Sequence, residues 1–218
     1  MPSHAPAKDV ARWQGPTKLW LDHARVGEHD LEWMAPVQSL VLWNVRLPEQ
    51  ALARLPDLVG VSLRGGTASD LGVLRGCESL MFLDVNQIRG LHDLTELSRL
   101  RSLEFLSLYG LPRVEAVPSL RENEKLAVLQ LGSLKGLRTL AGVIAAPALR
   151  SLQLIRRVPV RTEDVEGLAS HPTLEQFDWL AEDVPWRIVE PVVDRLKHLD
   201  RPRALDPDEW LDQRLGFQ

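Results

Sequence analysis

Apolar residues recur along the chain in a fixed local pattern, apolar-x-x-apolar-x-apolar. The copies are Val37/Leu40/Leu42, Leu58/Val61/Leu63, Leu80/Leu83/Val85, Leu103/Leu106/Leu108, Leu126/Leu129/Leu131, Leu149/Leu152/Leu154 and Leu174/Phe177/Trp179, with a degenerate copy at Leu19/Leu21. Their middle positions lie 21 to 25 residues apart, over roughly 160 residues. Such a sustained period predicts a repeat architecture.

Two apolar spacings within each unit predict its local structure. Leu83 and Val85 alternate with Asp84, so both are expected on one side of a short strand while Asp84 points to the other. After the strand the apolar spacing becomes three, beginning at Ile88 and Leu91, which favours tight turns and 3₁₀ segments. Each unit is therefore predicted to form one turn of a right-handed coil, and stacked turns share one leucine core.

The repeats resemble the leucine-rich repeat family over about residues 16–180, most clearly in CESLMFLDVNQI at 77–88, LRSLEFLSLYGL at 100–111 and NEKLAVLQLGSL at 123–134. The resemblance implies an α/β solenoid, a right-handed coil of about eight repeats with a parallel β-sheet on its concave face and a helical C-terminal cap. The family usually places Asn or Cys three residues after the last strand leucine. Here that position holds Val45, Gly66, Ile88, Leu111, Leu134 and Arg157. The turns are therefore expected to be satisfied by backbone and water, and the short units look most like irregular bacterial members.

The ends of the chain lack the repeat, and open stacks need capping. We predict four segments, namely a disordered N-terminus at 1–12, an N-terminal cap with a degenerate first repeat at 13–36, leucine-rich repeats at 37–183 and a C-terminal helical cap at 184–218. The cap contains two candidate helices. The first has Trp186, Val189, Val192 or Val193 and Leu196 at helical spacing, and the second has Asp206 as N-cap, Pro207 at its first position and apolar Trp210, Leu211 and Leu215. Both are expected to close the end of the stack; a detachable docking or dimerisation segment is the alternative.

The residues beside the inward leucines are predicted to line an exposed sheet face that binds a partner. The candidate binding residues are Trp20, Trp43, Arg64, Phe82, Asp84, Asn86, Phe105, Tyr109, Gln130, Gln153 and Asp178. Aromatic anchors flanked by Arg, Asp and Asn are typical of binding hot spots. In the alternative interpretation Phe82 and Phe105 stack as neighbouring rungs that only stiffen the sheet, and Trp20 and Trp43 lie under a folded N-terminal segment.

Composition excludes several classes of protein. A net charge of −4 without a basic stripe argues against nucleic-acid binding. No run of eighteen apolar residues predicts a membrane span, and the N-terminus lacks the apolar stretch of a secretory signal. Cys77 is the only cysteine, so we expect a reducing, cytoplasmic setting in which it is a buried filler.

The sequence contains no recognisable catalytic or metal-binding pattern. The six His are scattered, and HExxH, CxxC and GxSxG are absent. Arg64-Gly65-Gly66-Thr67 is interpreted as a tight turn, because no Lys follows to make it a phosphate loop. We therefore expect no catalytic residues, metal or cofactor.

Together these patterns favour a monomeric, non-enzymatic module that binds another protein through the concave sheet face, for example an immunity or regulatory protein. The alternative is a structural scaffold that self-associates, or joins a larger complex, through its C-terminal helices.

Overall fold

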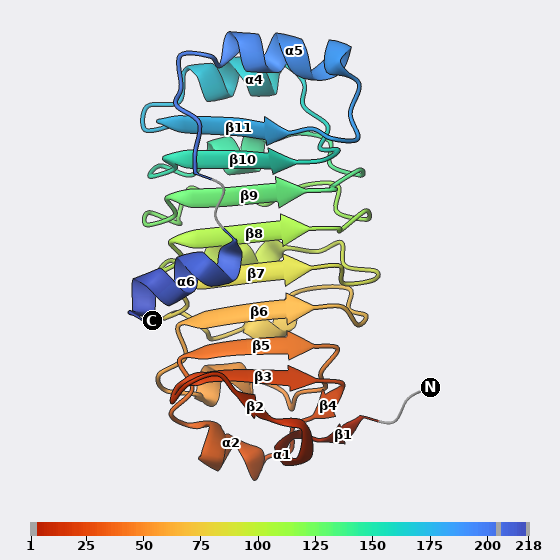
Figure 1. Cartoon of the computed structure of the whole chain (residues 1–218), viewed down its shortest axis with the longest axis vertical. Coiled ribbons are helices and arrows are strands. Elements are labelled where there is room, and N and C mark those ends of the chain that lie inside the picture. Colours follow the sequence, from red (N-terminus) through yellow and green to blue (C-terminus); the bar gives the residue numbers. More distant parts are fainter. Residues whose placement is uncertain (1–3, 204–205, 217–218) are drawn as a thin grey trace.

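The computed structural model describes residues 4–203 and 206–216, and a single large sheet dominates them (Figure 1). Its nine strands follow the order β11-β10-β9-β8-β7-β6-β5-β3-β2. Their bounds are β2 Arg12–Trp13, β3 Lys18–Asp22, β5 Ser39–Trp43, β6 Gly60–Arg64, β7 Phe82–Asn86, β8 Phe105–Tyr109, β9 Val128–Gly132, β10 Ser151–Ile155 and β11 Gln176–Leu180. Neighbours are parallel, except that β2 runs antiparallel to β3. A mostly parallel sheet with few helices confirms an α/β solenoid-like fold.

The strand register keeps equivalent positions of successive units in line. Leu83 lies opposite Val61 on one side and Leu106 on the other, and Leu106 lies opposite Leu129. All of these side chains are fully buried in one continuous apolar cluster. The prediction that the repeated leucines converge on a shared core is confirmed.

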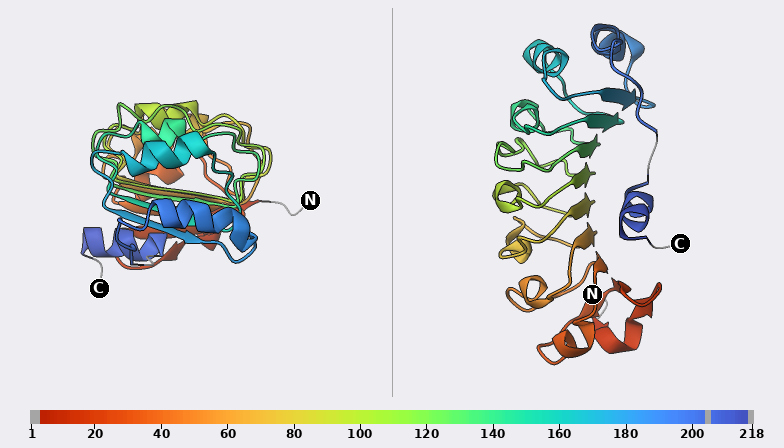
Figure 2. Two further views of the ribbon diagram at one scale, coloured as in Figure 1. Left: turned by 90° about the horizontal axis from the view of Figure 1, so that it is seen from above. Right: turned by 90° about the vertical axis from the view of Figure 1, so that its left-hand side faces the viewer.

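Each unit returns to the next strand through a segment on the other side of the core from the sheet (Figure 2). These segments contain 3₁₀ helices η1 Leu52–Arg54, η2 Gly72–Leu74 and η3 Thr95–Arg99, and α-helices α3 Ala141–Ile144 and α4 Thr162–Ala169. The period-three spacing predicted tight turns here, and 3₁₀ helices form in three of these segments.

A repeated backbone turn follows β3 and each strand from β5 to β10. The residue after each of these strands has a φ between 49° and 68°; these residues are His23, Asn44, Gly65, Gln87, Gly110, Ser133 and Arg156. The N–H of each donates to the carbonyl of the last residue of the next strand, at 2.7 to 3.0 Å. The backbone thus satisfies these turns, which confirms the backbone part of the expectation that backbone and water would do so.

Residues 4–12 are ordered, which corrects the prediction of disorder over 1–12; residues 1–3 lie outside the described part of the chain. The chain forms β1 Ala5–Pro6, α1 Ala7–Val10 and β2, and β1 pairs with β4 Ala24–Arg25. Ala7 is fully buried in the main core. Backbone pairing and this apolar contact hold the segment beside the first coil, which also contains α2 Asp30–Met34.

The two C-terminal helices occupy different places. Helix α5, Trp186–Arg195, contacts α4 and β11 at the end of the stack, where Val189 and Val192 are buried. Trp186 does not share that buried face and is 62% exposed. Helix α6, Pro207–Leu215, instead lies across the middle strands on the open face of the sheet (Figures 1 and 2). The expectation that both helices close the end of the stack is wrong for α6.

Candidate functional site: the concave sheet face

The eleven candidate residues all belong to strands of the sheet and alternate with the inward leucines. Strand pairing aligns them in columns, so that Arg64 lies opposite Asn86 and Asn86 opposite Tyr109. The structure therefore brings the candidates onto one face, although they do not share one environment there. Helix α6 covers the middle of the face, and the β5 and β10 sides of the face lie on either side of it (Figure 1).

The aromatic residues in the middle of the face are covered by α6. Phe82 and Phe105 stack with ring centroids 5.1 Å apart. The Trp210 ring lies 5.1 Å from Phe105 and 6.0 Å from Phe82. Both phenylalanines are fully buried, so the expectation that they lie on a wet surface is wrong. They stack as neighbouring rungs, as the alternative interpretation held, and a helix packs over them.

The second apolar contact of α6 depends on the absence of a side chain. Leu211 is 2% exposed and packs over Gly60, where a Cβ atom would lie 2.6 Å from Leu211 Cδ2. Gly60 occupies the column that holds Phe82 in the next strand. A glycine in this column thus leaves a socket for the leucine of α6.

Local sequence explains why α6 is a helix. The Asp206 carboxylate accepts a hydrogen bond from Asp208 N at 2.9 Å, and Pro207 occupies the first turn. Gly216 ends the helix with a φ of 71°. The roles of Asp206 and Pro207 were predicted from the sequence and are confirmed, whereas the role of Gly216 emerges from the structure.

Ion pairs surround the apolar contact between α6 and the sheet. Lys18 Nζ donates to Asp212 Oδ1 at 2.7 Å, and the Lys18 side chain is only 9% exposed. Arg64 Nη2 donates to Asp208 Oδ2 at 2.9 Å. At the other end of the helix, Arg214 contacts both carboxylate oxygens of Glu104, at 3.0 and 3.1 Å.

Arg64 joins this rim to the sheet. Its guanidinium carbon lies 5.5 Å from the centre of the Trp20 ring, and its Nε lies 3.4 Å from Asp84 Oδ2. Burial raises the pKa of Asp84 to about 6, although the Arg64 charge and a hydrogen bond from Ser107 act in the opposite direction. Burial beneath α6 therefore disfavours the ionised form of Asp84.

The two sides of the face beyond α6 differ in exposure, since Trp43 is exposed and Gln130 and Gln153 are buried. On the β5 side, Trp43 stacks with Trp20 at 6.3 Å and is 42% exposed, so no N-terminal segment covers Trp43. On the β10 side, Gln130 Nε2 donates to Gln153 Oε1 at 3.2 Å. These two glutamines line a cavity of about 240 Å³ beside Trp210. Asn86, Tyr109 and Asp178 are half-buried.

Lys18 and Gly60 were not among the candidate binding residues selected from the sequence, and Trp210 and Leu211 were expected at the end of the stack. An apolar stripe shows that a helix packs, but it does not show against which surface. A signal was nevertheless present in Gly60, because it leaves an aligned column of the sheet without a side chain.

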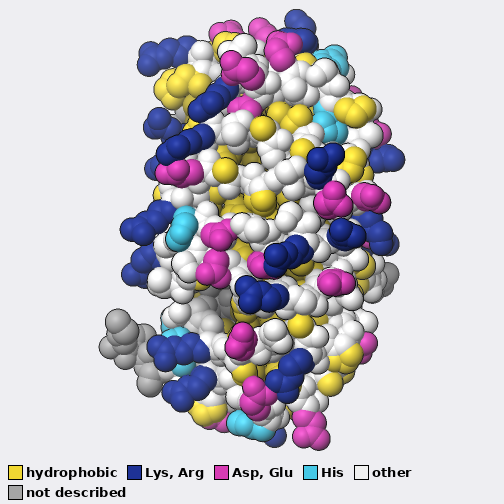
Figure 3. All heavy atoms as spheres, turned by 180° about the vertical axis from the view of Figure 1, so that it is seen from behind, with side chains coloured by type: hydrophobic (Ala, Val, Ile, Leu, Met, Phe, Trp, Pro, Cys, Tyr) yellow, Lys and Arg dark blue, Asp and Glu magenta, His cyan; other side chains and the backbone are white. Residues whose placement is uncertain are grey.

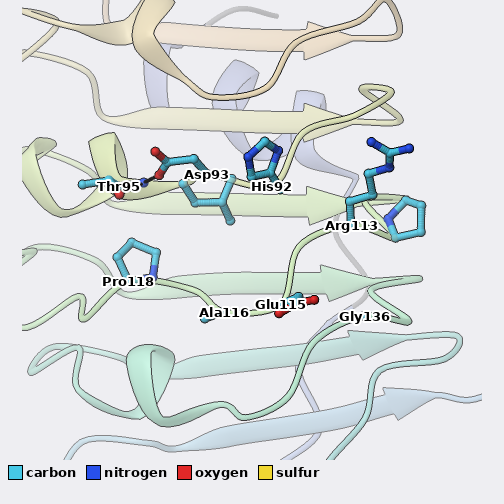
Figure 4. A pocket seen from close by; sticks show the side chains of 10 residues that line it. His92, Asp93, Thr95, Arg113, Glu115, Ala116, Pro118 and Gly136 are labelled. Atoms are coloured by element: carbon cyan, nitrogen blue, oxygen red, sulfur yellow. Dashed lines mark hydrogen bonds between the residues drawn. The ribbon is translucent and has the colours of Figure 1, made fainter.

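Other surfaces of the described chain show weaker sites. A shallow cavity of about 950 Å³ is lined by His92, Asp93, Thr95, Arg113 and Glu115, and Asp93 in it already accepts from Thr95 (Figure 4). The face opposite the sheet carries interspersed basic and acidic side chains (Figure 3). Within residues 4–203 and 206–216, no group of three His, Cys, Asp or Glu could hold a metal ion. No helix in the same ranges is long and apolar enough to span a bilayer.

Comparisons with known proteins add little to this description. No protein-family model matches the chain, and no curated protein matches it. Among solved structures it is similar to an internalin from Listeria monocytogenes, with 16% identity over 85% of this chain and 73% of that one and a TM-score of 0.29. This likeness is too weak to assign the chain to a family.

Proposed function

We propose that the chain is a leucine-rich repeat module without enzymatic activity, which binds a partner protein through the concave face formed by β3 to β11. One observation carries this proposal: the face already holds a peptide segment, α6, through side-chain contacts to Phe82, Phe105 and Gly60. An apolar centre surrounded by charged pairs is the usual composition of a protein-binding surface. An immunity or regulatory role, in which one dedicated partner is captured, fits such a surface.

Site-specific photo-cross-linking in the native host tests the proposal. Benzoylphenylalanine replaces Trp43 on the concave face, and in a control it replaces Arg99, an exposed residue of η3. A protein that cross-links from position 43 and not from position 99 supports the proposal. Equal labelling from both positions, or none from position 43, contradicts it.

A second candidate function is self-association through α5, because two large apolar side chains of this helix are exposed. Trp186 is 62% exposed and Ile188 is 49% exposed. Light scattering over a hundredfold range of concentration tests this function. A dimer that Trp186→Glu dissociates supports it, whereas a monomer throughout the range favours binding through the concave face.

A further inference from the structure

Helix α6 is packed as a ligand of the solenoid rather than as part of its core. The inward leucines form one continuous cluster that also includes Val189 and Val192 of α5. The contact of α6 is a separate cluster of Phe82, Phe105 and Leu211, with Trp210 and Leu215 packed beside it. Removing α6 therefore uncovers two phenylalanines but leaves the repeat core closed.

The charges of α6 complement those of the face. Its carboxylates Asp208 and Asp212 lie on the two cations Arg64 and Lys18. Neither cation is fully exposed, with side-chain exposures of 20% and 9%. Charge-assisted pairs of this kind select a bound segment whose charged groups are negative and have the same spacing as Asp208 and Asp212.

The aromatic contact determines which shape of helix surface fits the face. The Trp210 ring lies against two stacked phenylalanines, while the neighbouring Leu211 fills the socket over Gly60. Adjacent residues on a helix point about 100° apart, so a Trp-Leu pair fits a shallow surface with two separate recesses. The middle of the face thus accepts one side of a helix.

We propose that the partner of this face presents an acidic amphipathic helix with an aromatic-aliphatic pair, and that it binds by displacing α6. This inference rests on the proposed function and adds the chemistry of the partner and its competition with the chain's own helix. A helix attached by a short connection has an effective concentration in the millimolar range. Helix α6 therefore lowers the apparent affinity of every partner that binds the part of the sheet that α6 covers. A partner that also contacts Gln130 and Gln153, beside which α6 leaves a cavity of about 240 Å³, gains contacts that α6 lacks.

A peptide that copies α6 tests the inference directly. Residues 206–216 are synthesised with a lactam between Glu209 and a Lys introduced by Gln213→Lys, because these two positions are exposed and one turn apart. The lactam keeps the short peptide helical in isolation. Fluorescence anisotropy then measures its binding to the full chain and to the full chain carrying Trp210→Ala and Leu211→Ala, whose own helix has lost both anchors.

We expect the stapled peptide to bind the double variant at least tenfold more tightly than the unsubstituted chain. A peptide with Ala at positions 210 and 211 is the matched control and should not bind. Lys18→Glu in the double variant should weaken binding, and Asp212→Lys in the peptide should restore it. A second variant, with Asp208→Lys and Asp212→Lys, loosens α6 through its charges alone and should also take up the peptide.

Equal binding to the unsubstituted chain and both variants, or no binding to variants whose circular dichroism is native, overturns the inference. The two proposals fail in different ways. If the peptide binds but nothing cross-links from position 43, the proposed function fails and the helix seat remains. If a partner cross-links but the peptide does not compete with it, the function stands and the inference fails.

Discussion

At the scale of single residues, the same leucine pattern gives side chains two different environments. Leu106 points into the core and is fully buried, whereas its neighbour Phe105 points to the other face and is buried only because α6 covers it. Under the proposed function, alanine at Phe105 should weaken binding of a partner while the leucine core stays intact. The structure adds a second effect, since the same change also removes part of the seat of α6.

Truncation of a core leucine should lower the free energy of unfolding of the isolated chain. Leu106→Ala leaves a cavity among fully buried neighbours, and we expect the free energy of unfolding to fall by about 2–5 kcal/mol. Urea unfolding of the variant measures this loss. Arg121→Ala, at an exposed position, should change the free energy by less than about 0.5 kcal/mol. Similar small effects at both positions would contradict the shared core.

Asp84 should make the stability of the chain depend on pH. Burial raises its pKa from 3.8 to about 6, so the folded state holds a proton that the unfolded chain releases at lower pH. This group's contribution is therefore fully present below about pH 4 and is lost as pH rises towards 6. The loss is at most about 3 kcal/mol, because one pKa unit corresponds to about 1.4 kcal/mol.

Asp84→Asn removes that dependence while keeping the size of the side chain. The stability of the variant relative to the unsubstituted chain should rise between pH 4 and pH 7 and stay level above it. The facing groups Arg64, Ser107 and Asp208 are present in both proteins, so comparing the two urea titrations isolates Asp84. Parallel pH profiles for the two proteins would show that Asp84 is not desolvated.

At the scale of elements, the turn after each strand depends on backbone conformation rather than on a specific side chain. Gly65 and Gly110 occupy this position in two units, and Gln87 and Ser133 occupy it in two others, all with positive φ. This tolerance explains why the coil is regular although no single residue type recurs at the turn. The requirement at this position is for a residue that accepts left-handed geometry and donates its N–H.

Substitutions at Ser133 should separate conformation from side-chain chemistry. Ser133 has a φ of 49°, and its N–H donates to Ile155 O at 3.0 Å. Ser133→Val places a β-branched residue in left-handed backbone and should cost about 1–2 kcal/mol. Ser133→Gly keeps the hydrogen bond without that strain and should not lose stability on this account. Equal unfolding free energies for the Val and Gly variants would refute the argument.

At the scale of the whole molecule, the sequence predicted what depends on neighbouring units and missed what depends on distant contacts. The position of Leu83 follows from a repeat whose copies stack in order, so the register could be inferred from spacing alone. The capping of α6 by Asp206 and Gly216 is likewise local. The place of Trp210 follows from a contact with Phe82 and Phe105, more than 100 residues earlier, and no periodicity encodes it.

The distance between the end of the stack and α6 sets a limit on how the chain can close on itself. Asp200 pairs with Gln176 at the outer side of β11, and Trp210 contacts Phe105 of β8. Four strand intervals of about 4.8 Å separate Asp200 from β8, which puts these points roughly 19 Å from one another. Six residue steps, the number from Asp200 to Asp206, reach at most about 20 Å, so α6 cannot lie much farther from the end of the stack than β8.

Deleting residues 201–203 should therefore move α6 from its own sheet to that of a second copy. The shortened connection reaches only about 10 Å, too little for α6 to reach its seat within one chain. Exchange between two chains restores the same contacts, and we expect the mass measured by light scattering to be twice that of the unsubstituted chain. Adding Trp210→Ala and Leu211→Ala should return the deletion variant to a monomer, because the exchanged helix then has no anchors.

Three glycines inserted after Arg203 are the length control and should leave the chain monomeric. A deletion variant that stays monomeric and still buries Trp210, measured by fluorescence quenching in single-Trp versions of the chain, would show that the connection does not limit closure.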